Sequence, residues 1–234
     1  MQSIPSYDWG DVESPWIGAG LEIWGPLLDG RSPVRYPAQE NIYLQGEEFT
    51  DLYIVAEGRV CVSIFHPDGQ QRHLYIACPG AMFGEEACIL GQPHSTMATA
   101  IVDTLVYCIP SREAQQLVHH NGPLADLMLQ YQARKSRLMM AQSAMLSFDR
   151  AEQRIAKSLL HLCLTYGEPA AEGTRIQLRF TCTELAALVG TSRVTVNNVM
   201  LGLIHAGTLS REGACYVVRD APALQALAVQ LLDR

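Results

Sequence analysis

The first half of the chain alternates short apolar runs with regularly spaced glycines. Five glycines follow one another at intervals of 11 or 12 residues: Gly46, Gly58, Gly69, Gly80 and Gly91. Between them lie runs rich in β-branched and aromatic residues, for example 52–55 and 60–65. Short strands separated by turns at this interval predict an antiparallel barrel or sandwich over residues 33–110. Asp68-Gly69 is expected to form a hairpin turn, since glycine accepts the positive φ that such a turn needs.

After Pro110 the apolar residues recur at intervals of three and four, which predicts helices. The longest such stripe predicts a helix of about 25 residues, interrupted by one polar residue, Arg134. Its apolar positions are Leu124, Leu127, Tyr131, Leu138, Ala141 and Met145. Such a stripe belongs either to the core of the chain or to a contact between two chains. The length of the helix favours a coiled-coil-like dimer contact.

A second helix is predicted from about Asp149 to Thr165. We expect it to end at Tyr166-Gly167, with the glycine as a left-handed cap. The segment 168–173 is rich in small and acidic residues and is predicted to be a loop. Polar and apolar residues alternate over 174–180, which predicts a half-buried strand.

The sequence from Thr181 onward predicts two short helices joined by a tight turn. Thr181 and Glu184 have the spacing of a capping box, in which each side chain bonds the backbone amide of the other residue. The first helix is expected to stop at Gly190, and Ser192 is expected to cap the second. This pattern is typical of a helix-turn-helix, with a generic helical hairpin as the alternative. A two-stranded wing is predicted over 209–219.

In a helix-turn-helix the first residues of the second helix meet base edges in the major groove. Arg193 suits guanine or phosphate, Asn197 and Asn198 suit adenine, and Val194 suits a thymine methyl group, which favours an A·T-rich half-site. The predicted DNA-binding residues are Thr181, Thr183, Thr191, Ser192, Arg193, Val194, Thr195, Asn197 and Asn198.

Composition narrows the function classes. Hydrophobic residues make up 48% and charged residues 18% of the 234 residues, as in an ordinary globular protein. No run of eighteen apolar residues is present, so no membrane span is expected. Residues 1–120 contain 15 acidic and 5 basic residues, and residues 121–234 contain 9 and 12, giving net charges of −10 and +3. An acidic sensor joined to a mildly basic DNA reader fits this change of sign.

Candidate catalytic or metal chemistry is not evident. No nucleophile motif, phosphate loop or His/Cys set at metal spacing occurs, so we expect no enzyme activity, no catalytic residue and no metal site. The 7 cysteines include no Cys-x-x-Cys pair. We interpret them as small apolar side chains in a reducing cytoplasm, with a thiol redox role as the alternative.

The segment 180–196 resembles the signature of the catabolite-activator/FNR (CRP/FNR) superfamily of bacterial regulators. The stretches 46–58 and 80–85 independently resemble its cyclic-nucleotide-type β-roll, in the right order. The resemblance covers roughly residues 35–220. It implies an α+β fold with an N-terminal cyclic-nucleotide-binding-type β-roll, a long dimerisation helix and a C-terminal winged helix-turn-helix. The expected boundaries are 1–120 for the effector-sensing domain, 121–148 for the dimerisation helix and 149–234 for the DNA-binding domain.

The same resemblance implies a cytoplasmic homodimer that binds palindromic double-stranded DNA and RNA polymerase and responds to a small effector. Family members that bind cyclic AMP hold its phosphate with an Arg-Ser pair. Here that position reads His94-Ser95, followed by Thr96, and Met139-Met140 replace the hydroxyl pair that meets adenine. Both changes remove polar groups that cyclic AMP needs, so we expect a different effector.

The pattern is most similar to the halorespiration branch of the family, which senses chlorinated phenols. That resemblance implies pocket roles for Tyr75 and Lys135, whereas Glu85 stands where the branch has a second pocket lysine. We therefore expect a small apolar or aromatic effector with an anionic edge. The expected effector-binding residues are Tyr75, Gly84, Glu85, His94, Ser95, Thr96, Lys135, Met139 and Met140.

Alternatives remain for these residues. Lys135 could instead be a solvated charge on a helix face, and Glu85 could simply begin a helix, where acidic residues are favoured. Haem bound through His66, His73 or His94 and a cyclic-nucleotide effector are the alternative sensing chemistries.

Overall fold

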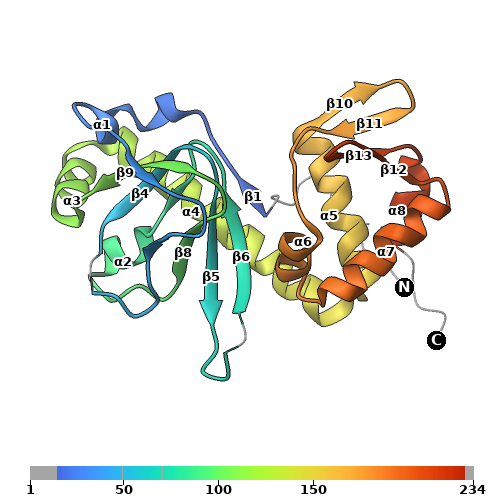
Figure 1. Ribbon diagram of the computed structural model, residues 1–234. Coiled ribbons are helices and arrows are strands. Elements are labelled where there is room, and N and C mark those ends of the chain that lie inside the picture. Colours follow the sequence, from blue (N-terminus) through green and yellow to red (C-terminus); the bar gives the residue numbers. More distant parts are fainter. Residues whose placement is uncertain (1–14, 49, 70, 230–234) are drawn as a thin grey trace, which may run out of the picture. The chain divides into compact units, whose positions relative to one another are not determined.

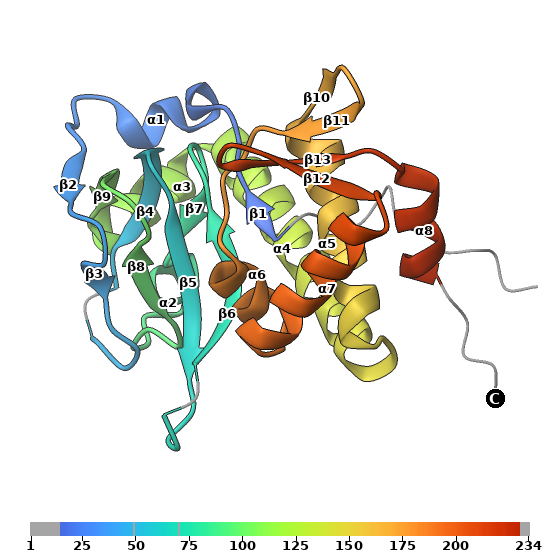
Figure 2. The ribbon, with the colours of Figure 1, turned by 45° about the vertical axis from the view of Figure 1, so that its right-hand side comes forward.

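The computed structural model describes residues 15–48, 50–69 and 71–229 (Figures 1 and 2). The described chain divides into two units within its longest helix, one ending at Ser136 and the other beginning at Arg137. The first unit contains most of the strands, and the second contains the helix-turn-helix.

Two sheets form the described part of the first unit. One has five strands in the order β1-β6-β5-β8-β3, and the other has four in the order β2-β9-β4-β7. The strands are β1 (Trp16–Ile17), β2 (Val34–Tyr36), β3 (Asn41–Tyr43), β4 (Leu52–Glu57), β5 (Val60–Phe65), β6 (Gln71–Ala77), β7 (Met82–Phe83), β8 (Met97–Ala100) and β9 (Thr104–Ile109). The helices are η2 (Leu21–Trp24), α1 (Gly25–Leu28), α2 (Glu85–Leu90) and α3 (Ser111–His120), with α4 (Gly122–Phe148) continuing into the second unit.

The regularly spaced glycines mark turns, as predicted. All five have φ between +62° and +86°. Gly69 lies in the hairpin that joins the antiparallel strands β5 and β6. Position 80 requires glycine for two reasons. Its φ is positive, and a Cβ there would lie 1.8 Å from the carbonyl oxygen of Ala19.

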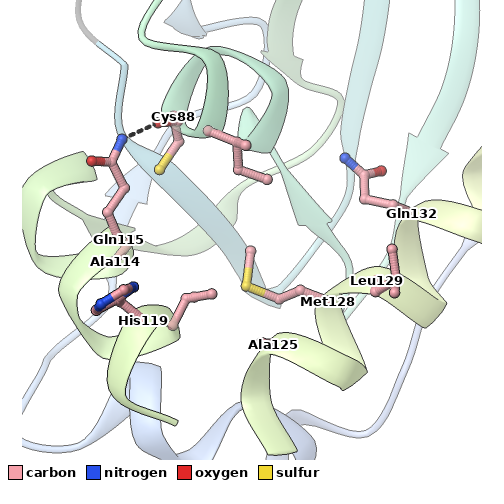
Figure 3. A pocket seen from close by; sticks show the side chains of 10 residues that line it. Cys88, Ala114, Gln115, His119, Ala125, Met128, Leu129 and Gln132 are labelled. Atoms are coloured by element: carbon pink, nitrogen blue, oxygen red, sulfur yellow. Dashed lines mark hydrogen bonds between the residues drawn. The ribbon is translucent and has the colours of Figure 1, made fainter. Parts of the chain in front are cut away.

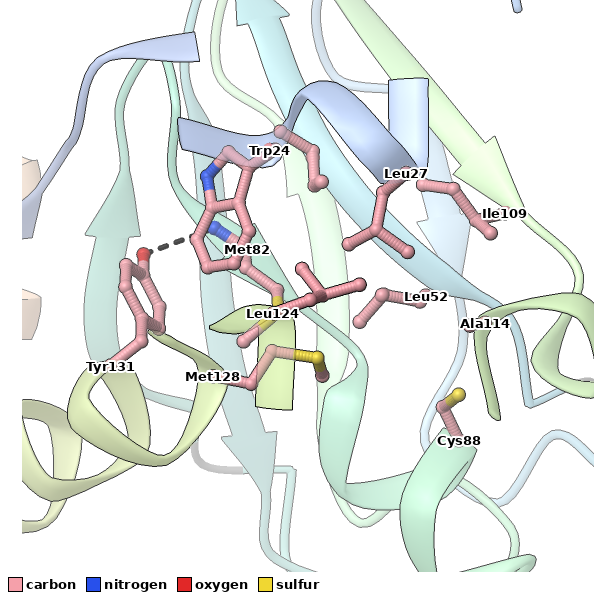
Figure 4. Packing of buried hydrophobic residues seen from close by; sticks show 11 residues of the cluster. Trp24, Leu27, Leu52, Met82, Cys88, Ile109, Ala114, Leu124, Met128 and Tyr131 are labelled. Atoms are coloured by element: carbon pink, nitrogen blue, oxygen red, sulfur yellow. Dashed lines mark hydrogen bonds between the residues drawn. The ribbon is translucent and has the colours of Figure 1, made fainter. Parts of the chain in front are cut away.

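The core of the first unit is closed by α4 (Figure 4). Leu124, Met128 and Tyr131 of this helix pack on Trp24 and Met82 and their neighbours. The Tyr131 hydroxyl accepts a hydrogen bond from the Met82 amide at 3.0 Å. The predicted dimer seam is therefore wrong at these positions, because Leu124 and Tyr131 face the core of their own chain. Leu138 and Ala141, further along the stripe, are also buried.

A different face of α4 is exposed and uncharged. Leu129 is 71% exposed and Met140 63%. Between and beyond them, at intervals of three and four, lie further exposed small residues on the same face: Ala133, Ser136, Ala144 and Ser147. We call these six residues the α4 stripe. This exposed face is different from the apolar stripe that the sequence predicted as a dimer contact.

The second unit consists of α5 (Ala151–Tyr166), α6 (Cys182–Val189), α7 (Arg193–His205), α8 (Ala221–Val229) and a four-stranded sheet. The sheet has the order β10-β11-β13-β12. Its strands are β10 (Gly167–Ala170), β11 (Gly173–Ile176), β12 (Leu209–Glu212) and β13 (Cys215–Val218).

The expected left-handed cap at Gly167 is wrong. Gly167 has φ −84° and ψ 135° and is paired with Ile176 in an antiparallel hairpin. Glycine is needed there for a different reason, since a Cβ would lie 2.1 Å from the carbonyl oxygen of Cys163. The segment predicted as a loop after Gly167 consequently forms most of the hairpin β10–β11. The predicted wing is confirmed as β12 and β13, which pair from Leu209 to Val218.

Candidate DNA interface and effector site

The first helix of the helix-turn-helix, α6, begins with the predicted capping box. The Thr181 hydroxyl accepts a hydrogen bond from the Glu184 amide at 3.1 Å, and the Glu184 carboxylate accepts one from the Thr181 amide at 2.6 Å. The helix ends at Gly190, whose φ of +65° reverses the chain. The chain bends by 111° between α6 and α7, within the range of about 90–120° for this motif.

The second helix, α7, presents its N-terminal face to solvent. Ser192 caps it by accepting from the Thr195 amide at 3.0 Å, and the hydroxyls of these two residues lie 2.8 Å apart. Val196 and Met200 face the interior. Thr191 and Thr195 are half-buried, and the other predicted DNA-binding residues are exposed: Thr181, Thr183, Ser192, Arg193, Val194, Asn197 and Asn198. The Val194 side chain on this face is 69% exposed.

Arg154 of α5 is a residue that sequence reasoning missed. Its guanidinium donates hydrogen bonds to backbone carbonyls of the turn between α6 and α7. It lies 35 residues before that turn, so no local pattern connects the two.

The effector site predicted in the first unit centres on Lys135, which is buried at 7% exposure. Its ammonium donates to the Tyr75 hydroxyl at 2.9 Å, the Met82 carbonyl at 2.6 Å and Glu85 Oε1 at 2.7 Å. The alternative of a solvated charge on a helix face is therefore wrong. Glu85, itself 5% exposed, does begin α2 and also serves as the counter-ion of Lys135.

Burial acts on the titration of this group of side chains. It lowers the pKa of Lys135, which the charge of Glu85 opposes by favouring the ammonium form. Burial also raises the pKa of the Tyr75 hydroxyl well above its ordinary value. The arrangement is thus a buried, hydrogen-bonded ion pair beside a neutral phenol, at the start of α2.

The surroundings of position 84 leave no room for a side chain. It has φ +75°, and a Cβ would lie 2.9 Å from the Asp51 carbonyl oxygen and 2.8 Å from the Tyr53 ring. The glycine therefore lets the backbone approach β4 closely as it enters α2.

His94, Ser95 and Thr96 form a second group. The His94 ring is 1% exposed and stacks on Tyr43, with ring centroids 3.7 Å apart and planes at 8°. The Ser95 amide and hydroxyl donate to the Glu86 carboxylate at 3.1 and 2.9 Å. The Thr96 hydroxyl lies 3.1 Å from the Tyr43 hydroxyl. Glu86 and Tyr43 were not predicted to take part, because nothing in their sequence neighbourhood indicates these contacts.

Met139 and Met140 lie further along α4, in the second unit. Met139 is half-buried and Met140 is exposed. Of the predicted effector residues, the structure therefore brings Tyr75, Glu85 and Lys135 into direct contact.

No group of three His, Cys, Asp or Glu side chains in 15–48, 50–69 and 71–229 is placed to hold a metal ion. His66 lies on the exposed hairpin with its ring 2.9 Å from Asp68, and His73 is half-buried in β6. The described cysteines range from buried to half-buried.

An apolar groove of about 360 Å³ lies between α2, α3 and α4 in the first unit (Figure 3). Its lining includes Cys88 of α2, Val118 of α3, and Met128 and Leu129 of α4, of which Leu129 also belongs to the α4 stripe. The side-chain amide of Gln115 donates a hydrogen bond to the Cys88 carbonyl oxygen at 2.6 Å.

Among the described residues, none of the helices taken alone has the length and hydropathy of a membrane span. The bent pair of α6 and α7 meets that test by length and composition only.

A sensor-type β-roll, a long helix and a winged helix-turn-helix on one chain define a ligand-responsive transcription regulator. Comparison with known proteins agrees: residues 33–121 match the cyclic nucleotide-binding domain, and residues 153–227 match the Crp-like helix-turn-helix domain. The chain belongs to the CRP/FNR family of transcription regulators.

Individual relatives cover most of the chain. The Cyclic AMP receptor protein of Thermus thermophilus is 33% identical over 196 residues, which is 84% of this chain and 88% of the relative. A CRP-like cAMP-activated global transcriptional regulator of Mycobacterium tuberculosis is 29% identical over 192 residues, 82% of this chain and 86% of the relative. The solved structure of FixK2 from Bradyrhizobium japonicum shares the fold, with a TM-score of 0.75 at 23% identity over 86% of this chain and 98% of that chain.

Proposed function

We propose that the protein is a homodimeric regulator that binds a palindromic DNA site when a small effector occupies its β-roll. The observation that carries the proposal is the exposed N-terminal face of α7, where an apolar and three polar side chains project together. Ser192 is engaged in capping, so Arg193, Val194, Asn197 and Asn198 are the side chains free to meet bases.

Each of these side chains suits a particular partner. Arg193 can contact guanine with two hydrogen bonds or a phosphate, and Asn197 or Asn198 can pair with adenine. Val194 would pack on a thymine methyl group. Thr181, Thr183 and Thr191, near the N-termini of the two helices, would contact phosphates, where helix dipoles add to the attraction. Thr195 would support this face through its contact with Ser192. An A·T-rich half-site follows.

The partner copy would pack along the α4 stripe. The stripe is free of charged residues, while the buried face of the same helix is used by its own chain. Two parallel copies of α4 would bring the two α7 helices to half-sites about 34 Å apart. We place the functional boundaries at 1–120, 121–148 and 149–234.

We propose a small apolar or aromatic effector with an anionic edge, bound near Tyr75, Gly84, Glu85 and Lys135. Lys135 is the cation for the anionic edge, and the effector must compete with Glu85 for it. This resembles the halorespiration branch in its tyrosine and lysine and departs from it at Glu85.

Cyclic AMP is disfavoured by the second group of residues. The Ser95 amide and hydroxyl are donors that a phosphate would need, and both already bind the Glu86 carboxylate. The sequence has His94 where the family's phosphate arginine stands, and the His94 ring is buried and stacked on Tyr43. The alternatives are a sensor based on haem or on a thiol, and a cyclic nucleotide as the effector. We also propose that the protein is cytoplasmic and contacts RNA polymerase on DNA.

The experiment is a selection of genomic DNA fragments with the full-length protein, with and without aromatic acids, phenols and cyclic AMP. The proposal predicts an enriched palindrome that depends on an aromatic acid or phenol. Enrichment with cyclic AMP alone would overturn the effector assignment. The DNA-binding assignment would be overturned if two results came together. The selection would enrich no sequence in any condition, and the wild-type protein would bind non-specific DNA no better than Arg193→Ala does.

A further inference from the structure

Arg154 joins two distant parts of the second unit through its guanidinium. Nε donates to the Val189 carbonyl at 2.6 Å and Nη2 to the Gly190 carbonyl at 3.1 Å. Nη1 donates to the Asp149 carbonyl at 2.7 Å. One side chain of α5 therefore contacts both the end of α6 and the residue that follows α4.

The carbonyls at the end of α6 need such a donor. The last carbonyls of a helix have no amide partner within the helix. After α6 the amides of Gly190 and Thr191 both turn back to the Ala186 carbonyl, so they do not serve Val189 or Gly190. A guanidinium supplies several donors in a fixed plane, and its charge suits the negative end of the helix dipole.

The third acceptor is itself held in place. The Asp149 carboxylate binds the Lys157 ammonium at 2.5 Å, and both side chains are nearly buried, at 12% and 5% exposure. The Asp149 amide continues the hydrogen bonding of α4 by donating to the Met145 carbonyl at 2.9 Å. Arg154 therefore binds the turn of the helix-turn-helix to a fixed point at the junction of α4 and α5.

We propose that Arg154 is a positioning residue for DNA recognition: it sets the turn between α6 and α7, and with it the recognition helix, relative to the α4–α5 junction. Thr191 and Ser192 follow the bound carbonyls directly, and Ser192 starts α7. A displacement of the junction is passed through Arg154 to the first turn of α7. The inference rests on the proposed DNA-binding function, and Arg154 acts without touching DNA.

The test compares Arg154→Met with Arg150→Met in the full-length protein. Arg150 is exposed at the N-cap of α5, four residues earlier, and carries the same charge, so its variant controls for the loss of a positive charge. Binding is measured to the palindrome recovered by selection and to a scrambled duplex of equal length, over a series of salt concentrations. Thermal unfolding and gel filtration of each variant are recorded alongside.

We expect Arg154→Met to weaken binding to the palindrome by about 10-fold or more beyond Arg150→Met, because hydrogen bonds from a charged donor are lost. Binding to the scrambled duplex and the dependence of affinity on salt should match those of Arg150→Met. An arginine that contacts a phosphate would instead lower the salt slope by about one. Lysine lacks the planar arrangement of donors, so Arg154→Lys should give an intermediate loss.

Equal effects of the two methionine variants on both duplexes, or a reduced salt slope for Arg154→Met alone, would overturn the positioning role. If Arg154→Met does not fold, Arg154→Lys is used instead. Reduced discrimination between the palindrome and the scrambled duplex, with unchanged binding to the scrambled duplex, would support the positioning role. Unchanged discrimination would overturn it. Failure of the wild-type chain to select any palindrome would count against the proposed function, not against the role of Arg154.

Discussion

Lys135 of α4 is hydrogen-bonded to buried polar groups of the first unit. A buried ammonium is stable only when its charge is balanced and its donors are used, and here Glu85, Tyr75 and the Met82 carbonyl meet both conditions. The sequence indicated Lys135 and Tyr75 through a resemblance to a phenol-sensing branch. It did not indicate that Glu85 binds the lysine, because the two are 50 residues apart and no periodicity joins them.

Removing one partner of this ion pair leaves the other as an uncompensated buried charge. Lys135→Met should therefore destabilise the protein by about 3 kcal/mol or more. The double variant Lys135→Met/Glu85→Gln should recover a large part of that loss, since no buried charge remains. Urea unfolding of the wild type, both single variants and the double variant measures the coupling. Additive losses would mean that the two charges do not depend on each other.

His161 gives the second unit a dependence on pH. Burial lowers the pKa of His161 below its ordinary value near 6.5. Between the lowered pKa and 6.5 the unfolded chain binds a proton that the folded chain does not, so stability falls as pH decreases below about 6.5. Thermal unfolding from pH 7.5 to 5 should show this fall in the wild type and a smaller one in His161→Gln. Parallel curves for the two proteins would contradict the assignment.

At the scale of elements, the pattern of apolar positions was sufficient where one local signal determines an element. The turn glycines, the capping box of α6, the cap of α7 and the wing are of this kind. The pattern failed where tertiary packing chose between equivalent faces or conformations. The apolar stripe of α4 from Leu124 to Tyr131 fits a dimer seam as well as a core, and only the position of Trp24 and Met82 decides. Gly167 likewise fits a helix cap as well as a close backbone contact.

The capping box of α6 contributes to stability independently of DNA. Thr181→Ala removes the acceptor of the Glu184 amide and should cost about 1 kcal/mol. Thr183→Ala, an exposed change two residues later, is the matched control and should leave stability nearly unchanged. Chemical unfolding measures both. If Thr183→Ala costs as much as Thr181→Ala, the cap is not what stabilises the start of α6.

At the scale of the whole molecule, charge and symmetry determine how the parts are used. The first half of the sequence has a net charge of −10 and the second half +3, so the charge that attracts DNA phosphates lies in the half with the helix-turn-helix. In the proposed dimer two helix-turn-helix units bind one duplex, so the binding of the first raises the effective concentration of the second. The α4 stripe is the proposed contact between the two copies.

Met140 is the largest exposed side chain near the middle of that stripe. Met140→Asp places two like charges at the contact and should convert the dimer into monomers. Gln130→Asp adds the same charge on another exposed position of α4 and should leave the dimer intact. Sedimentation measures the mass of each. A dimeric Met140→Asp would move the contact to another surface.

The dependence of DNA binding on the spacing of two half-sites tests directly whether the protein reads DNA as a two-fold symmetric dimer. Fluorescence anisotropy is measured with the selected palindrome and with the same half-sites separated by about 5 more base pairs, half a turn of the duplex. A two-fold symmetric dimer requires both half-sites on one face of the duplex, so we expect tight, effector-dependent binding to the palindrome and a large loss of affinity with the insertion. Equal binding to both duplexes, with or without effector, would contradict this expectation.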